Sequence, residues 1–210
     1  RNTYWSFGQD SDDNFKIGNS VHFGTASTIK FALDTNSRIS LSNNDSGASN
    51  TIFGYTSGGN IASGGDKNTL FGKSTGFSIS TGDSNTNLGW EAGYYNATGS
   101  NNTAVGSGSM MGASGQNHSD NTSVGFNSLK AITTGGHNVA IGKQSGLDLT
   151  SASYNVLVGS MSGYEVTTNE GNVFLGYQAG KNTAGAYHYN IAIGMQSLSA
   201  AHTQSGTVSI

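Results

Sequence analysis

The chain has 210 residues, a formal net charge of −3, no Cys and no Pro, and only 10% of its residues are charged. The lack of Cys excludes a disulfide framework and a thiolate metal site, and nine scattered Lys and Arg residues argue against a nucleic-acid-binding surface. No apolar run is long enough to cross a bilayer, so we expect no membrane insertion. Gly, Ser, Thr and Asn dominate, yet 10% of the residues are aromatic, which favours a regular, thinly packed structure over disorder.

Residues 1–49 are predicted to form an N-terminal β segment that attaches or caps the rest of the chain. Alternating apolar residues indicate short strands at 29–33 and 39–41, and the acidic cluster at 10–13 indicates a polar turn. The sequence opens on Arg1 and shows no signal peptide, so we expect it to be a piece of a longer polypeptide.

From residue 50 onward the sequence is a repeat with a period of 17 to 19 residues, built on the motif Asn-[Thr/Val/Ile]-x-apolar-Gly. The nine motif asparagines are Asn50, Asn68, Asn85, Asn102, Asn121, Asn138, Asn155, Asn172 and Asn190. The nine motif glycines are Gly54, Gly72, Gly89, Gly106, Gly125, Gly142, Gly159, Gly176 and Gly194. A tenth copy begins at Thr207. The repeat predicts an all-β solenoid (a parallel β-roll or β-helix) over residues 50–210, with one coil per repeat of about 17 residues.

Each column of the repeat predicts a structural role. The Asn column is expected to form a hydrogen-bonded ladder between coils, and the Gly column a corner with positive φ or close backbone contact. A small residue, Ser, Thr or Ala, always stands three positions after the Gly, which indicates tight packing. The β-branched and apolar residues at motif positions two and four are expected to share the buried face of a strand.

The middle residue of each predicted strand varies, and it is mostly apolar or small. This second face is expected to meet another chain rather than water. Because a 17-residue coil has a narrow apolar stripe, we expect three chains to pack around one axis as a homotrimer. Nine coils at about 4.8 Å each would make a rod roughly 43 Å long.

The sequence carries no pattern of catalysis, metal binding or cofactor binding. The carboxylates recur in no column, although a glycosidase needs a clustered pair, so a polysaccharide-processing β-helix enzyme is the less favoured alternative. The five His residues lack ligand spacing, and no Ser has the surroundings of a catalytic nucleophile. We therefore expect no enzyme activity, no metal site and no cofactor.

Two features permit other functions. Aromatic residues follow several motif glycines, and Trp90 with Tyr94 and Tyr95 is a candidate glycan contact, although packing on a neighbouring coil or chain explains such residues more simply. Five consecutive repeats place Thr at motif position two, from Thr51 to Thr122, as ice-binding solenoids do. The ice-binding hypothesis is rejected because the same face carries large apolar residues that favour burial.

The motif resembles the repeats of the YadA-like head of trimeric autotransporter adhesins and of related phage tail fibres. The resemblance covers residues 50–210 and is carried by segments such as Asn138-Val139-Ala140-Ile141-Gly142. It implies a left-handed trimeric β-roll that adheres to host surfaces. The period of 17 is longer than is typical of YadA-like heads and, with Gly176-Tyr177-Gln178-Ala179-Gly180, is closer to arrays in phage tail-fibre shafts.

Repeat and resemblance together predict an extracellular structural and adhesive fibre segment, most simply a phage tail fibre that provides reach and host attachment. The alternative is the head of a bacterial trimeric adhesin. The expected partners are two further copies of the chain and a glycan or protein of the host surface.

Overall fold

The computed structural model describes residues 6–9, 15–18, 29–33, 39–40, 49–182, 187–200 and 204–210. The chain divides into two compact units, Arg1–Asp45 and Ser46–Ile210. The first unit contains a four-stranded antiparallel sheet in the order β1-β2-β3-β4. Its strands are β1 (Ser6–Gln9), β2 (Phe15–Gly18), β3 (Ile29–Leu33) and β4 (Ile39–Ser40). Strands predicted near 29–33 and 39–41 are present, whereas the predicted acidic turn at 10–13 lies outside the described residues.

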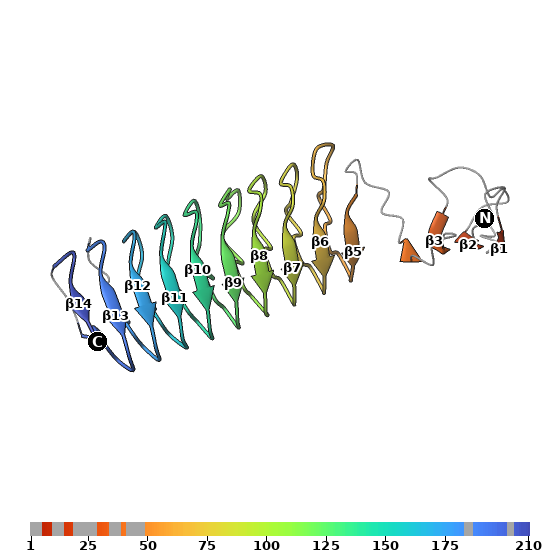
Figure 1. Ribbon diagram of the computed structural model, residues 1–210. Coiled ribbons are helices and arrows are strands. Elements are labelled where there is room, and N and C mark those ends of the chain that lie inside the picture. The colour runs from red at the N-terminus through yellow and green to blue at the C-terminus, as the bar shows by residue number, and fades with distance from the viewer. Residues whose placement is uncertain are drawn as a thin grey trace. The chain divides into compact units, whose positions relative to one another are not determined.

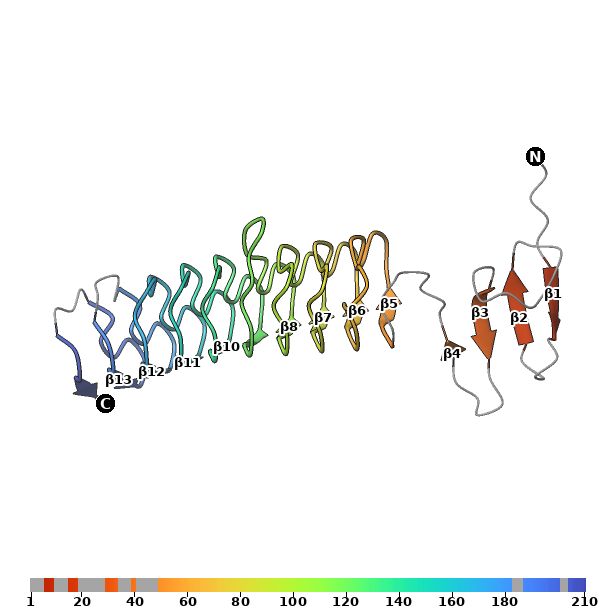
Figure 2. The same ribbon diagram turned by 90° about the horizontal axis from the view of Figure 1, so that it is seen from above.

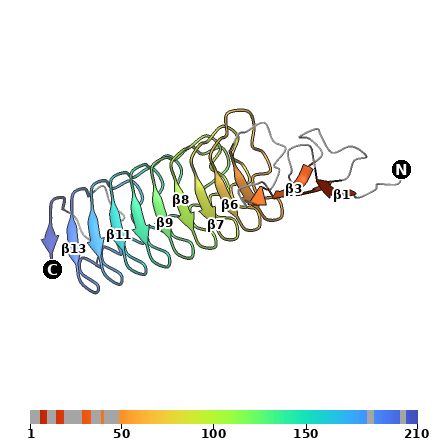
Figure 3. The same cartoon turned by 45° about the vertical axis from the view of Figure 1, so that its right-hand side comes forward.

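The second unit is a β-solenoid, as the repeat predicts (Figures 1 and 3). Each motif forms one short strand, and the ten strands make one parallel sheet in strict chain order. The strands are β5 (Thr51–Phe53), β6 (Thr69–Phe71), β7 (Thr86–Leu88), β8 (Thr103–Val105), β9 (Thr122–Val124), β10 (Val139–Ile141), β11 (Val156–Val158), β12 (Val173–Leu175), β13 (Ile191–Ile193) and β14 (Val208–Ser209). The last of these is the predicted tenth strand, which pairs Val208 with Ile191.

The predicted orientation of the strands is wrong. In each of β6 to β13 the middle residue is buried, and the first and third residues are half-buried or exposed. Phe71, for example, is 51% exposed, whereas Leu70 beside it is fully buried. The variable middle position therefore faces the coil interior, and the two regular positions face outward. The reason is space: the interior of a 17-residue coil is too narrow for two large side chains from every strand.

The variation in the middle column has a physical explanation. The residue six positions further along the coil lies across the interior from it, and the sizes of the two are matched. Where the strand carries a large residue the partner is Gly: a Cβ on Gly180 would lie 2.3 Å from the ring of Phe174, and one on Gly163 would lie 2.8 Å from Leu157. Where the strand carries Ala or Ser, the partner is Met or Leu in three of four coils. These pairs are Ala104 with Met110, Ser123 with Leu129, and Ala192 with Leu198.

The fourth small residue, Ala140, faces Gly146, and the coils on either side supply the missing volume. A Cβ on Gly146 would lie 2.9 Å from methyl groups of both Leu129 and Leu157. The interior is thus packed as one continuous column. A coil with little side-chain volume is compensated by larger side chains from the coils on either side.

The predicted asparagine ladder is confirmed. The side-chain oxygen of each motif Asn accepts hydrogen bonds from the backbone N–H of the next motif residue and, from Asn68 to Asn172, from the next side-chain amide as well. For Asn138 the acceptor contacts are to Asn155 N at 3.0 Å and Asn155 Nδ2 at 3.1 Å. Asn138 Nδ2 in turn donates to Asn121 Oδ1 at 3.0 Å and to the carbonyl of Ala152 at 2.8 Å. Each buried amide therefore fixes the register between its own coil and two others.

The predicted corner and small-residue columns are confirmed as well. The motif glycines have φ between 115° and 140°, and a Cβ on Gly142 would lie 2.5 Å from the carbonyl oxygen of Gly159. No side chain fits between backbones that approach so closely. The small residue three positions later is buried in most coils. From Ser109 on, where this residue is Ser, its hydroxyl bonds the next strand: Ser145 Oγ donates to the carbonyl of Leu157 at 2.9 Å.

Replacing Asn138 with Ala is expected to lower the free energy of unfolding by roughly 2–4 kcal/mol, because several buried donors and acceptors lose their partners together. Urea denaturation followed by circular dichroism measures the change. Lys143→Ala is the control, since Lys143 is exposed in the same coil and its loss should change stability by less than about 0.5 kcal/mol. Equal stability of the two variants would contradict the ladder.

The size matching predicts a rescue. Leu157→Ala alone is expected to cost about 2–5 kcal/mol by opening a cavity, and Gly163→Leu alone is expected to destabilise by overpacking and by placing a side chain at positive φ. The double variant is expected to lose about 1–2 kcal/mol less unfolding free energy than the two single variants lose together, because the new Leu fills the cavity. A double-mutant cycle by thermal denaturation measures the coupling, and strictly additive effects would refute the matching.

Candidate functional surfaces

The outward face of the solenoid sheet carries a continuous apolar stripe, formed by the third residue of each strand. Its most exposed members are 38 to 54% exposed. The stripe consists of Phe53, Phe71, Leu88, Val105, Val124, Ile141, Val158, Leu175 and Ile193. Neighbouring members contact one another through the in-register pairing, and the rings of Phe53 and Phe71 stack at 4.9 Å. A contiguous apolar surface of this kind is typical of an interaction site.

A second apolar column comes directly after the corner. The residue after each motif glycine points outward, and five of these nine residues are large and apolar or aromatic. They are Tyr55, Trp90, Phe126, Tyr177 and Met195, and each is at least 48% exposed. Because the corner glycine separates this column from the stripe, the apolar surface extends around one edge of the coil.

The candidate glycan-contact residues do not form one cluster. The rings of Tyr94 and Tyr95 meet edge to face at 4.5 Å, and Tyr94 also stacks on Phe77 at 5.1 Å. Trp90 lies in the corner column and, within the described part of the chain, makes no ring contact with either tyrosine. The structure therefore separates Trp90 from the tyrosine pair.

Tyr94 belongs to a surface ridge that the sequence interpretation did not identify. The residue five positions after each motif glycine is half-buried in most coils and carries a long or aromatic side chain. The ridge consists of Phe77, Tyr94, Met111, Lys130, Leu147, Tyr164 and Lys181. Lys181 Nζ lies 6.0 Å from the centroid of the Tyr164 ring, a weak cation–π contact. Tabulating every column of the repeat, rather than the motif alone, would have identified this ridge.

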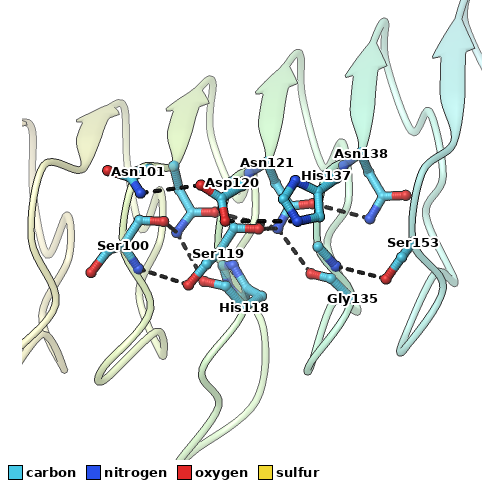
Figure 4. A network of polar contacts seen from close by, with 12 residues as sticks. Ser100, Asn101, His118, Ser119, Asp120, Asn121, Gly135, His137, Asn138 and Ser153 are labelled. Carbon is cyan, nitrogen blue, oxygen red and sulfur yellow. Dashed lines mark hydrogen bonds and ion pairs between the residues drawn. The ribbon is translucent and has the colours of Figure 1, made fainter.

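A polar edge lies on the loops that precede the asparagine ladder (Figure 4). Asn101 Nδ2 donates to Asp120 Oδ1 at 3.1 Å, and His137 Nε2 lies 4.0 Å from Asp120 Oδ2. The His137 ring in turn stacks on Tyr154 at 5.0 Å. Beneath these side chains, the Ser119 hydroxyl accepts a hydrogen bond from the backbone N–H of Ser100 at 3.0 Å. The edge joins successive loops through exposed and half-buried contacts.

His118 differs from His137, whose side chain is exposed. Its side chain is buried, and neither ring nitrogen has a hydrogen-bond partner among the residues that the structure describes. Burial lowers the pKa of His118 from 6.5 to about 4, because desolvation disfavours the charged imidazolium. His118 lies in the longest coil, three positions before the motif Asn, where the neighbouring coils carry Gly99 and Gly135; its carbonyl accepts from Asn102 Nδ2 as that of Gly135 accepts from Asn121 Nδ2. The imidazole therefore serves as a neutral core residue.

No metal cluster and no membrane-spanning helix is found among the described residues. Nowhere among them do three His, Asp or Glu side chains gather closely enough to hold a metal ion. They also include no helix long and apolar enough to cross a membrane. No protein-family model matches the sequence, and no curated protein or solved structure shows significant similarity to the chain.

The buried imidazole predicts a pH dependence of stability. The folded-state pKa of about 4 lies below the unfolded value of 6.5, so the unfolded chain binds more protons between these values. The unfolding free energy is therefore expected to fall, by on the order of 3 kcal/mol, as the pH drops from above 6.5 to below 4. His118→Leu should remove this contribution, whereas His137→Gln, at an exposed position, should retain it. Chemical denaturation at a series of pH values measures the unfolding free energy of each variant. If this free energy changes with pH equally in the wild type and in His118→Leu, His118 does not contribute to the pH dependence of stability.

Proposed function

We propose that the chain is a shaft and adhesion segment of a trimeric extracellular fibre, of the kind found in phage tail fibres, that provides reach and host-surface attachment without catalysis. The observation that carries the proposal is the outward apolar stripe along the full length of the sheet. An isolated coil stack leaves Phe53, Phe71, Leu88 and Ile141 exposed to water, which is unfavourable by about 25 cal/mol for each Å² of apolar surface. Burial of the stripe against other chains removes this cost.

A second copy of the same chain is the partner that fits the stripe best. Its apolar residues recur every 17 to 19 residues through nine coils, and only a surface with the same period matches them throughout. Three copies fit better than two because the apolar surface extends around an edge of the coil. A two-fold dimer uses one self-complementary face, whereas a cyclic trimer uses two different faces of each chain. The stripe and the corner column, which contains Trp90 and Phe126, provide two such faces.

The absence of a recurring acidic pair supports a mechanical rather than an enzymatic role. The repeated columns are occupied by Asn, Gly, small residues and apolar residues, and each of them contributes to stacking of the coils. An ice-binding role fits less well, because the outward Thr column ends at Thr122 and is continued by Val and Ile from Val139 to Ile191. The head of a bacterial trimeric adhesin would use the same surfaces and remains the alternative context.

Charges placed on the stripe are expected to dissociate the trimer. The double variant Ile141→Lys and Val158→Lys brings six cations to the centre of a three-chain assembly, so light scattering should report the mass of one chain, about 21.5 kDa. The wild type should show three times this mass and migrate as a trimer on SDS gels without boiling.

Thr134→Lys is the control for that experiment, since Thr134 is exposed on a loop away from the sheet. It should leave the mass unchanged. A monomeric wild type would refute the trimeric shaft, and it would direct attention to freezing-point measurements on the exposed Thr column.

A further inference from the structure

A surface pocket lies beside the longest coil of the array. The regular columns of the repeat do not predict it. Coil Asn102–Asp120 has 19 residues, and its extra length forms a loop that rises above its neighbours between β8 and β9 (Figure 2). Beside this loop lies a cavity of about 480 Å³ that continues over the next two coils. This volume is within the range of roughly 300–1,000 Å³ that is typical of ligand pockets.

The pocket combines an apolar wall with unengaged polar groups. Met111, Ala113, Ala131 and Leu147 supply apolar surface. The polar lining consists of Asn127, Lys130, Gln144 and Asp148, all half-buried. Within the described residues, none of these four side chains has a hydrogen bond or an ion pair to another part of the chain. Half-buried polar groups that converge without protein partners are suited to a ligand that carries hydrogen-bonding groups of its own.

The pocket opens on the side of the coil away from the sheet. Leu129 and Ser145 belong to the same side but point inward, and Ser145 bonds the backbone of the β11 strand at Leu157. The outward side chains on this side therefore point away from the apolar stripe. The trimer also uses the corner column, whose residues Phe126 and Lys143 directly precede the pocket residues Asn127 and Gln144, so the pocket is accessible in a trimer that leaves these two side chains uncovered.

The tyrosine pair adjoins the pocket. The backbone N–H of Tyr95 donates to the carbonyl of Met111 at 3.0 Å, so Tyr94 and Tyr95 lie one coil before the pocket wall at the same height of the coil. The ridge therefore places an aromatic surface next to a pocket that offers one carboxylate, one ammonium and two amides. Sugars need this combination, because their C–H faces pack on aromatic rings and their hydroxyls both donate and accept hydrogen bonds.

We propose that this pocket, with Tyr94 and Tyr95 at its edge, binds a neutral saccharide unit of a surface glycan, an inference that rests on the proposed adhesive function. Asp148 accepts hydrogen bonds from sugar hydroxyls, Lys130 donates to a hydroxyl or ring oxygen, and Asn127 and Gln144 do both. Lys130 and Asp148 carry opposite charges, so the pocket as a whole is neutral and favours an uncharged sugar. The attachment site then lies on the flank of the shaft, across the longest coil and the two coils that follow it.

The test is saturation-transfer NMR on the full chain with a panel of neutral sugars at about 10 mM, enough to detect a Kd of about 1 mM. The panel contains glucose, galactose, mannose, N-acetylglucosamine and their disaccharides, with sialic acid as the acidic comparison. We expect transfer to at least one neutral sugar and little to sialic acid. Asp148→Asn, which keeps the shape but removes the charge, should weaken binding at least about tenfold.

Glu165→Gln is the matched control, because Glu165 occupies the position equivalent to Asp148 in the following coil, outside the pocket. It should bind like the wild type. The proposal is overturned if no neutral sugar binds, if only sialic acid binds, or if Asp148→Asn and Glu165→Gln bind equally. It is also overturned if Asp148→Asn lowers the mass of the assembly, which would place the pocket in a chain interface. If the chain is a trimer that binds no sugar, the saccharide proposal is refuted and the trimeric shaft is not. If the chain is a monomer that binds sugar, the trimeric shaft is refuted and the saccharide proposal is not.

Discussion

The structure depends on the fixed register between successive coils, which the buried asparagine amides enforce. A side-chain amide such as that of Asn138 bonds the motif Asn before it and the one after it, and it also bonds the loop carbonyl of Ala152. A shift of one residue between coils would leave all of these groups buried and unpaired, at about 1–3 kcal/mol for each group. The register in turn aligns the corner glycines, and from Gly54 to Gly176 each backbone approaches the next too closely for any side chain. The apolar stripe, the corner column and the ridge are straight because this register holds from β5 to β14.

The architecture could be predicted from sequence because its signals are local and repeated. Nine copies of Asn and Gly at a fixed spacing indicate a ladder and a corner without reference to distant contacts. The orientation of the strand could not be deduced in the same way, since positions two and four look like a buried face and the middle column looks irregular. The missing information was the pairing across the coil interior, where Phe174 requires Gly180 and Ala192 accepts Leu198. Such compensation is visible only when columns six residues apart are compared.

The candidate surfaces were predictable only in part. The exposed aromatics after the corner could be identified from the sequence, but the separation of Trp90 from Tyr94 and Tyr95 depends on how the coil turns. The buried His118 lies in the longest coil, and the pocket spans that coil and the next two, so neither follows from the regular motif. The Asn, Gly and small-residue columns are explained by stability alone, whereas the polar lining of the pocket is not, and a binding function is therefore best sought there.

A trimeric shaft requires the outward apolar stripe to be covered by copies of the same chain. Sedimentation equilibrium of the unmodified chain over a wide concentration range tests this requirement directly. We expect a single species with three times the chain mass of 21.5 kDa, even at the lowest concentration. A species with the mass of one chain at every concentration would contradict the trimer, because the stripe would then be stable in water.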